Sequence, residues 1–200
     1  MNIILDYGLG NLGSVETAFL RAGIASKVTS NVQEIEACTS LVIPGVGAFR
    51  DGIEALHLSG AIPYIHKHVA SGKPLLGICL GMQLLYELSY ENGKYAGLGF
   101  LEGTVEKLDV PYKIPHMGWN ALKLQKEDEV MKYIAEGDFV YFVHSYYVNS
   151  SNEEVLAYAD YGVKVPAIVR KGNVIGMQFH PEKSATVGAN LIKAYGELIS

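Results

Sequence analysis

The chain has 200 residues, 49% of them hydrophobic, and a formal net charge of -5 at pH 7. This length and composition are sufficient for one well-buried core, so we expect a single domain over residues 1–200. The acidic balance without a run of Lys or Arg argues against nucleic acid as a partner, and the lack of an apolar run near the roughly 20 residues that span a bilayer argues against a membrane protein.

Short apolar runs bounded by Gly and Pro characterise the first part of the chain. They cover residues 3–5, 41–43 and 75–79 and are typical of buried parallel strands. Between them, residues 14–22 and 62–70 have apolar side chains at three- and four-residue spacings, which predicts amphipathic helices. The alternation predicts an α/β fold with a doubly wound, mostly parallel sheet flanked by helices.

After Gly97 the pattern changes to runs rich in Thr, Tyr and Val. These runs predict strands over residues 139–148, 155–161, 167–170 and 174–179. Lys171-Gly172-Asn173 between the last two predicts a hairpin turn. The second half is therefore expected to be strand-rich and partly antiparallel, with residues 187–199 closing the chain as a helix.

The segment Gly77-Ile78-Cys79-Leu80-Gly81 stands where an apolar run ends and a helical pattern over residues 82–88 begins. It has the G-x-nucleophile-x-G form of a strand-to-helix turn, with Cys as the nucleophile. Glycines let such a turn close, the helix N-terminus favours a negatively charged sulfur, and the Leu80 N–H would serve as an oxyanion donor. Most free cysteines are small buried hydrophobes, which is our expectation for Cys38.

A thiolate that cleaves an amide needs a general acid for the leaving nitrogen, and histidine is the usual carrier near neutral pH. His180 and Glu182 follow the last predicted strand, where residues two apart project to the same side. Glu182 would then orient the imidazole as the carboxylate does in a Ser-His-Asp triad. We therefore predict a triad of Cys79, His180 and Glu182.

Five other histidines compete for the role of base. His57, His66 and His68 fall on helical patterns and are expected to be surface or packing residues. His116 and His144 are stronger rivals, although neither has a carboxylate two or three residues away. No grouping of His and Cys has the spacing of metal ligands, so neither a metal nor a cofactor is expected.

Three motifs in chain order resemble those of the class I glutamine amidotransferases: PGVG at 44–47, GICLGMQ at 77–83 and HPE at 180–182. The resemblance covers the whole chain and implies a flavodoxin-like core. It implies that Cys79 attacks the side-chain amide of glutamine to form a thioester, and that His180 protonates the departing ammonia. The other residues it assigns are Gly45, Val46, Gly47 and Leu80 around the oxyanion, and Gln83, Glu91, Ser145 and Tyr146 around glutamine.

Within that family, residues 6–11, 115–120 and 142–146 are similar to the glutaminase subunits of imidazole glycerol phosphate synthases, which act in histidine biosynthesis. The similarity implies a heterodimer with a (β/α)8-barrel cyclase, which uses the ammonia to make imidazole glycerol phosphate and an aminoimidazole-carboxamide ribonucleotide. Two cysteines without a pairing pattern suit a reducing cytoplasm. Met and Trp are enriched in interface cores, so we expect the partner to contact the segment that holds His116, Met117, Trp119 and Asn120; core packing is the alternative.

Other functions share some of these signals. Residues 8–13 spell G-x-G-x-x-G, as in dinucleotide-binding proteins, but no acid ends the second strand to bind a ribose, and Asp6 would repel a pyrophosphate. A thiol hydrolase of the same fold would share Cys79 and His180 without the PGVG strand. Amidotransferase subunits of anthranilate or aminodeoxychorismate synthases differ chiefly in the oxyanion strand and the partner-facing segments, so they stay open as alternatives.

Overall fold

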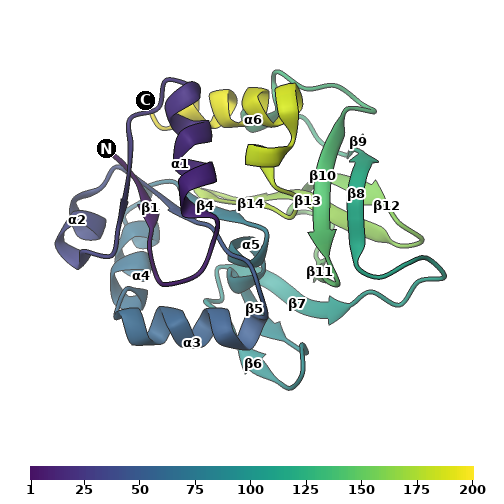
Figure 1. Cartoon of the computed structure of the whole chain (residues 1–200), viewed down its shortest axis with the longest axis horizontal. Coiled ribbons are helices and arrows are strands. Elements are labelled where there is room, and N and C mark those ends of the chain that lie inside the picture. The colour runs from purple at the N-terminus through teal and green to yellow at the C-terminus, as the bar shows by residue number, and fades with distance from the viewer.

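The computed structural model describes residues 1–200 as an α/β protein (Figure 1). The helices are α1 (Leu12–Arg21), α2 (Val32–Ala37), α3 (Phe49–Ser59), α4 (Ile62–Ala70), α5 (Leu80–Leu84) and α6 (Ala185–Leu198), with two 3-10 turns, η1 (Glu129–Met131) and η2 (Pro181–Lys183). None of the helices has the length and apolar character needed to cross a membrane.

Fourteen strands form three sheets. The main sheet has the order β2-β1-β3-β4-β14-β13-β12-β9 and is built from β1 (Asn2–Leu5), β2 (Ser26–Thr29), β3 (Ser40–Ile43), β4 (Leu75–Ile78), β9 (Lys123–Leu124), β12 (Val155–Asp160), β13 (Lys164–Lys171) and β14 (Val174–Met177). The strands from β2 to β14 in this order are parallel, and those from β14 to β9 are antiparallel. The predicted mostly parallel sheet with an antiparallel extension is confirmed.

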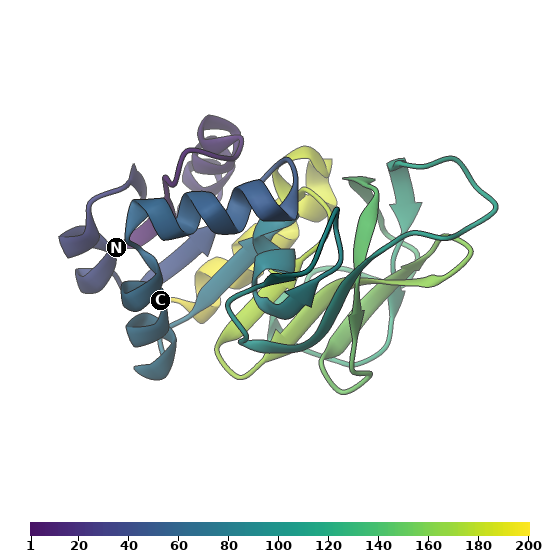
Figure 2. The same ribbon diagram turned by 90° about the horizontal axis from the view of Figure 1, so that it is seen from below.

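Two smaller sheets complete the strand-rich half of the chain, which Figure 2 shows beside the helical layers. One pairs β8 (His116–Ala121) with β10 (Phe139–His144), and the other has the order β11-β7-β5-β6, from β5 (Tyr86–Ser89), β6 (Tyr95–Ala96), β7 (Leu101–Lys107) and β11 (Tyr146–Ser150).

Alternate residues of the central strands face two separate cores. Ile3 and Leu5 pack in the core beneath α2, α3 and α4, whereas Ile4 packs in the core beneath α1 and α6. Figure 1 shows these two groups of helices on opposite sides of the main sheet. Burial on both faces explains why these strands read as continuous apolar runs in the sequence.

The predicted helix over residues 82–88 is wrong beyond its first half. The helix α5 ends at Leu84, and Tyr86 already belongs to β5. The carbonyls of Leu84 and Leu85 accept hydrogen bonds at 2.8 Å from the N–H groups of Leu98 and Phe100, so contacts with a distant segment replace the bonds that would continue the helix.

The predicted strand over residues 139–148 is two strands. β10 pairs with β8 up to His144, and β11 pairs with β7 from Tyr146, so Ser145 carries the chain from one sheet to another. The predicted hairpin is confirmed: Lys171 pairs with Val174, and Gly172 has the positive φ of 58° that this two-residue turn requires.

Candidate active site

The site lies at the carboxyl ends of four neighbouring parallel strands. Tyr7 lies just beyond β1, Gly45 beyond β3, Cys79 directly after β4 and Gln178 directly after β14. These strands are adjacent in the main sheet, so segments that are far apart in the sequence converge at one edge. This edge is the usual ligand site of open α/β sheets.

A sharp turn presents Cys79 at this edge. Its φ is 55°, an uncommon value for a residue with a side chain, and its N–H donates to the Met177 carbonyl at 2.7 Å. A Cβ on Gly81 would lie 1.8 Å from the Ile43 carbonyl oxygen, and one on Gly77 would lie 2.7 Å from the Gly81 oxygen. Both glycines are therefore required for α5 to pack this closely against the strands.

We expect Gly81→Ala to lower the free energy of unfolding by more than about 3 kcal/mol, because the methyl group collides with backbone that cannot move aside. Gly13→Ala is the matched control: a Cβ there meets nothing within 4 Å, and alanine in a helix stabilises by about 0.5–1 kcal/mol. Urea unfolding measures both changes. Equal stability of Gly81→Ala and wild type would contradict the packing argument.

His180 and Glu182 form a buried pair. His180 Nδ1 lies 2.8 Å from Glu182 Oε1, and their side chains are 3% and 1% exposed. The expected contact is present, but not because the two residues project from one face of a strand. Instead, the 3-10 turn η2, which begins at Pro181, brings the carboxylate back under the imidazole.

Several effects act on the imidazole of His180. Burial opposes its protonation, but the neighbouring Cys79 and the hydrogen-bonded Glu182 outweigh burial and raise the pKa of His180 to about 9. His180 Nε2 itself makes no hydrogen bond. At neutral pH this arrangement favours an imidazolium held beside the sulfur, with Nε2 free to give its proton to a ligand.

The rival histidines have no nitrogen free for proton transfer. His144 Nδ1 donates to the Tyr146 carbonyl at 2.9 Å, so its Nε2 must accept from His116 Nδ1 at 3.0 Å, and His116 Nε2 accepts from Asn120 at 3.2 Å. Burial lowers the pKa of His116 to about 4 and, with the neighbouring His116, that of His144 to about 3. Both histidines are therefore neutral groups with both ring nitrogens engaged, whereas His180 Nε2 makes no hydrogen bond.

A cavity of about 430 Å³ opens over Cys79. Its volume suits a ligand the size of an amino acid. It is lined by Val46, Gly47, Cys79, Leu80, Gln83, Glu91, Pro115, Val143, His144, Ser145, Tyr146 and His180. Of the residues expected at the site, only Gly45, packed beneath Tyr7, and Glu182, behind His180, do not line the cavity.

Two side chains in the cavity have an unused acceptor. Gln83 Nε2 donates to the Tyr146 carbonyl at 2.9 Å and to Gln178 Oε1 at 3.0 Å, so its Oε1 is the atom left for a ligand. Glu91 Oε2 accepts from the Phe49 N–H at 2.7 Å, and burial raises the pKa of Glu91. A ligand with an ammonium group would satisfy both acceptors.

Two further residues of the candidate site, Tyr7 and Gln178, could not be assigned from the sequence. The Tyr7 hydroxyl donates to the Pro44 carbonyl at 2.6 Å, directly before Gly45, and burial and the charge of Cys79 raise the pKa of Tyr7. Tyr7 thereby fixes the start of the PGVG segment, which follows β3. Gln178 approaches the Cys79 sulfur. Tyr7 lies within residues 6–11 and Gln178 lies two residues before the HPE motif, but neither has a side chain whose chemistry by itself indicates catalysis.

A second Cys-His contact lies elsewhere. Cys38 Sγ is 3.5 Å from His68 Nδ1, and His68 Nε2 donates to the Pro74 carbonyl at 2.9 Å. Burial raises the pKa of Cys38 and lowers that of His68, so both groups stay neutral. This is a packing contact between a thiol and an imidazole, and the lowered pKa of His68 contrasts with the raised pKa of His180 beside Cys79.

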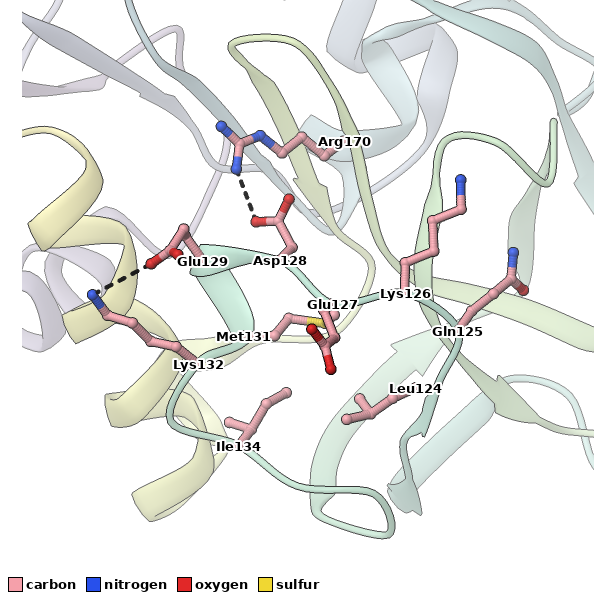
Figure 3. Close-up of a pocket in the computed structure, with 10 residues that line it drawn as sticks. All are labelled: Leu124, Gln125, Lys126, Glu127, Asp128, Glu129, Met131, Lys132, Ile134 and Arg170. Atoms are coloured by element: carbon pink, nitrogen blue, oxygen red, sulfur yellow. Dashed lines mark hydrogen bonds and ion pairs between the residues drawn. The ribbon is translucent and has the colours of Figure 1, made fainter.

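A larger cavity of about 800 Å³ lies away from Cys79 (Figure 3). Its cations are already bound by protein acceptors: Arg170 pairs with Asp128 at 2.8 Å, Lys132 with Glu129 at 3.8 Å, and Lys126 donates to the Glu153 carbonyl at 2.6 Å. None of the sequence motifs reaches this cavity, so the cavity over Cys79 is the candidate active site.

Known proteins resemble this chain over nearly its whole length. The family model described as Glutamine amidotransferase class-I matches residues 3–194. A protein of Caldanaerobacter subterraneus subsp. tengcongensis named imidazole glycerol phosphate synthase subunit HisH is 50% identical over 198 residues, 98% of this chain and 97% of that protein. One of the same name from Oceanobacillus iheyensis is 47% identical over 200 residues, all of both chains. The solved structure described as a crystal structure of glutamine amidotransferase matches with a TM-score of 0.78 at 24% identity, covering 98% of each chain.

Proposed function

Because the chain belongs to the class I glutamine amidotransferase family, we propose that it is the glutaminase subunit of an imidazole glycerol phosphate synthase, an enzyme complex of histidine biosynthesis. The observation that supports the chemistry most directly is the cavity over Cys79, which adjoins the buried pair of His180 and Glu182. We also propose the cytoplasm as its place of action, because a reducing compartment keeps Cys38 and Cys79 unpaired.

The first half of the reaction releases ammonia. The Cys79 thiolate attacks the side-chain amide carbon of glutamine, and a negative charge develops on the amide oxygen. The backbone N–H groups of Leu80 and of the PGVG segment are the proposed donors to this oxygen. His180 then gives its Nε2 proton to the amide nitrogen, the carbon–nitrogen bond breaks, and ammonia leaves a glutamyl thioester on Cys79.

The second half restores the enzyme. His180, now neutral, takes a proton from water at Nε2 while the water oxygen attacks the thioester carbon. The carbon–sulfur bond breaks, glutamate forms, and Cys79 returns as a thiolate beside the imidazolium. Glu182 keeps the proton of His180 on Nδ1 throughout, so that Nε2 is always the nitrogen that exchanges protons with the ligand.

The α-ammonium group of glutamine is the proposed partner of the two unused acceptors, Gln83 Oε1 and the second oxygen of Glu91. A bound ammonium would counter the effect of burial on Glu91 and favour its ionised form. Ser145 and Tyr146 line the same cavity beside Gln83 and complete the proposed binding site. The cavity thus holds a carboxylate and an amide oxygen for the ammonium group, and the sulfur of Cys79 lines the same space.

An exposed apolar surface adjoins the cavity and is the proposed contact with a (β/α)8-barrel cyclase in a heterodimer. Met117 and Trp119 of β8 are 59% and 52% exposed, and they pair with Val143 and Tyr141 of β10. Pro115 and Val143 line the cavity, so ammonia is released next to this surface. His116 points to the opposite, buried face of β8, and its side chain is therefore not part of the contact.

We expect this protein to release ammonia from glutamine slowly by itself and faster with the cyclase and its nucleotide ligand. Trp119→Glu should abolish most of that increase, because truncating a central aromatic of an interface and adding a charge typically costs about 2–4 kcal/mol of binding. Leu58→Glu is the matched control, since Leu58 is 83% exposed on α3, away from β8 (Figure 1).

Ammonia release and binding of the cyclase are measured for both variants. If the cyclase does not change the rate of ammonia release, the glutaminase activity is supported but the proposed partner is contradicted. Equal loss in Trp119→Glu and Leu58→Glu would contradict the proposed contact surface.

A further inference from the structure

A buried glutamine links the cavity wall to the reactive sulfur. Gln178 is fully buried and follows β14 directly. Its main-chain N–H donates to the Ala167 carbonyl at 3.0 Å, and two residues later the His180 N–H donates to the Tyr141 carbonyl at 3.0 Å. The backbone is therefore held on both sides of the side chain. The Gln178 side chain reaches Cys79 Sγ, and His180 lines the same cavity as Cys79, so the two residues approach the sulfur from one segment of the chain.

The orientation of the Gln178 amide is determined by its neighbours. The Tyr146 carbonyl can only accept, so the Gln83 atom 2.9 Å from it must be Nε2. The same nitrogen lies 3.0 Å from Gln178, which must then present Oε1 to it. The remaining atom, Gln178 Nε2, faces Cys79 Sγ at 3.9 Å. The sulfur therefore meets an N–H donor and not an amide oxygen.

We propose that Gln178 is a positioning residue that donates a hydrogen bond from Nε2 to the Cys79 thiolate and, through Oε1, holds Gln83 in place for the substrate. The proposal rests on the proposed glutaminase function. A donor on the sulfur favours the ionised over the protonated form and restrains its direction of attack. Because the donor is neutral, it does not compete with His180 as an acid.

Substitutions can test the roles of the two ends of the Gln178 side chain separately. Gln178→Glu has nearly the same shape and keeps an oxygen that accepts from Gln83, but it replaces the donor at the sulfur by an acceptor. A carboxylate beside the sulfur disfavours the thiolate form of Cys79. Asn2→Asp is the matched control, because Asn2 is also a buried, hydrogen-bonded amide but lies at the opposite end of β1 from Tyr7.

The direct readout is the rate of Cys79 alkylation by iodoacetamide as a function of pH, in a Cys38→Ala background that leaves one thiol. We expect Gln178→Glu to move the half-maximal rate upward by about one pH unit or more, as the loss of a hydrogen bond to a charged group implies. In the complex with the cyclase, kcat should fall between about 10-fold and 100-fold with little change in KM. Asn2→Asp should leave both unchanged.

An unchanged alkylation profile in a folded Gln178→Glu protein would overturn the proposal. If this variant does not fold, Gln178→Met decides in the same way, because it keeps the length of the side chain and removes both polar ends. Its alkylation profile should also move upward, and its KM should rise because Gln83 loses its partner. The alkylation experiment uses no glutamine, so its outcome is independent of whether the glutaminase assignment holds.

Discussion

Replacing Cys79 by alanine should reduce ammonia release from glutamine by at least about 10⁴-fold, since both halves of the proposed reaction depend on a covalent bond to this residue. The substitution removes only the sulfur, because alanine adopts the φ of 55° at no greater cost than cysteine. The folded structure and binding to the cyclase should therefore persist. Ammonia release in the complex and the urea unfolding curve measure the two effects.

Cys38→Ala is the control for this prediction, because Cys38 is the other free cysteine and also lies next to a histidine. Its thiol and the His68 imidazole are neutral, and neither lines the cavity over Cys79. We expect Cys38→Ala to keep full activity and to lose only packing stability. A loss of activity in Cys38→Ala that equals the loss in Cys79→Ala would contradict the assignment of the nucleophile.

The second large effect is expected for Glu182→Gln. An amide can present its N–H to Nδ1 of His180 and so favour the tautomer with the proton on Nε2, which is the wrong nitrogen for accepting a proton from water. We expect kcat to fall by about 10³–10⁴-fold. Glu34→Gln changes a carboxylate that pairs with Lys27 at the surface and should not alter kcat. Activity of Glu182→Gln near that of wild type would contradict the orienting role.

Stability should change with pH in a way that depends on the same carboxylate. The pKa of His180 is raised in the folded protein from 6.5 to about 9, so the folded state binds the proton more tightly than the unfolded state. This stabilisation is fully present below pH 6.5 and is lost as pH rises through about 9. Urea unfolding should show a decrease in stability over this range, and a smaller decrease in Glu182→Gln.

Most of the parallel core could be predicted from the sequence, because strands buried on both faces leave continuous apolar runs. The run at 41–43 corresponds to β3, and the helical pattern at 62–70 coincides with α4. The helix predicted over residues 82–88 and the single strand predicted over residues 139–148 were wrong, because contacts with distant segments determine the structure there. Nothing local in residues 82–88 shows that Leu98 and Phe100 bind the carbonyls at the end of α5, and nothing local in residues 139–148 shows that Ser145 changes sheets.

The candidate site was predictable to the extent that its chemistry has local signatures. The glycine frame indicated Cys79, and the neighbouring carboxylate distinguished His180 from the other histidines. Gln178 and Tyr7 act through hydrogen bonds to groups more than 30 residues away, and an amide or a phenol in the sequence does not reveal such a partner. From the sequence His144 remained a rival candidate for the base, because the hydrogen bonds that occupy both ring nitrogens of His144 are visible only in the structure.

Cleavage of glutamine through a covalent bond to Cys79 can be tested directly with an electrophilic glutamine analogue that carries a reactive ketone in place of the amide. The complex is treated with this analogue, and the adduct is located by mass spectrometry. We predict one adduct per chain, on Cys79, prevented by excess glutamine and absent from Cys79→Ala. An adduct on Cys38, or equal labelling of Cys79→Ala, would contradict the claim.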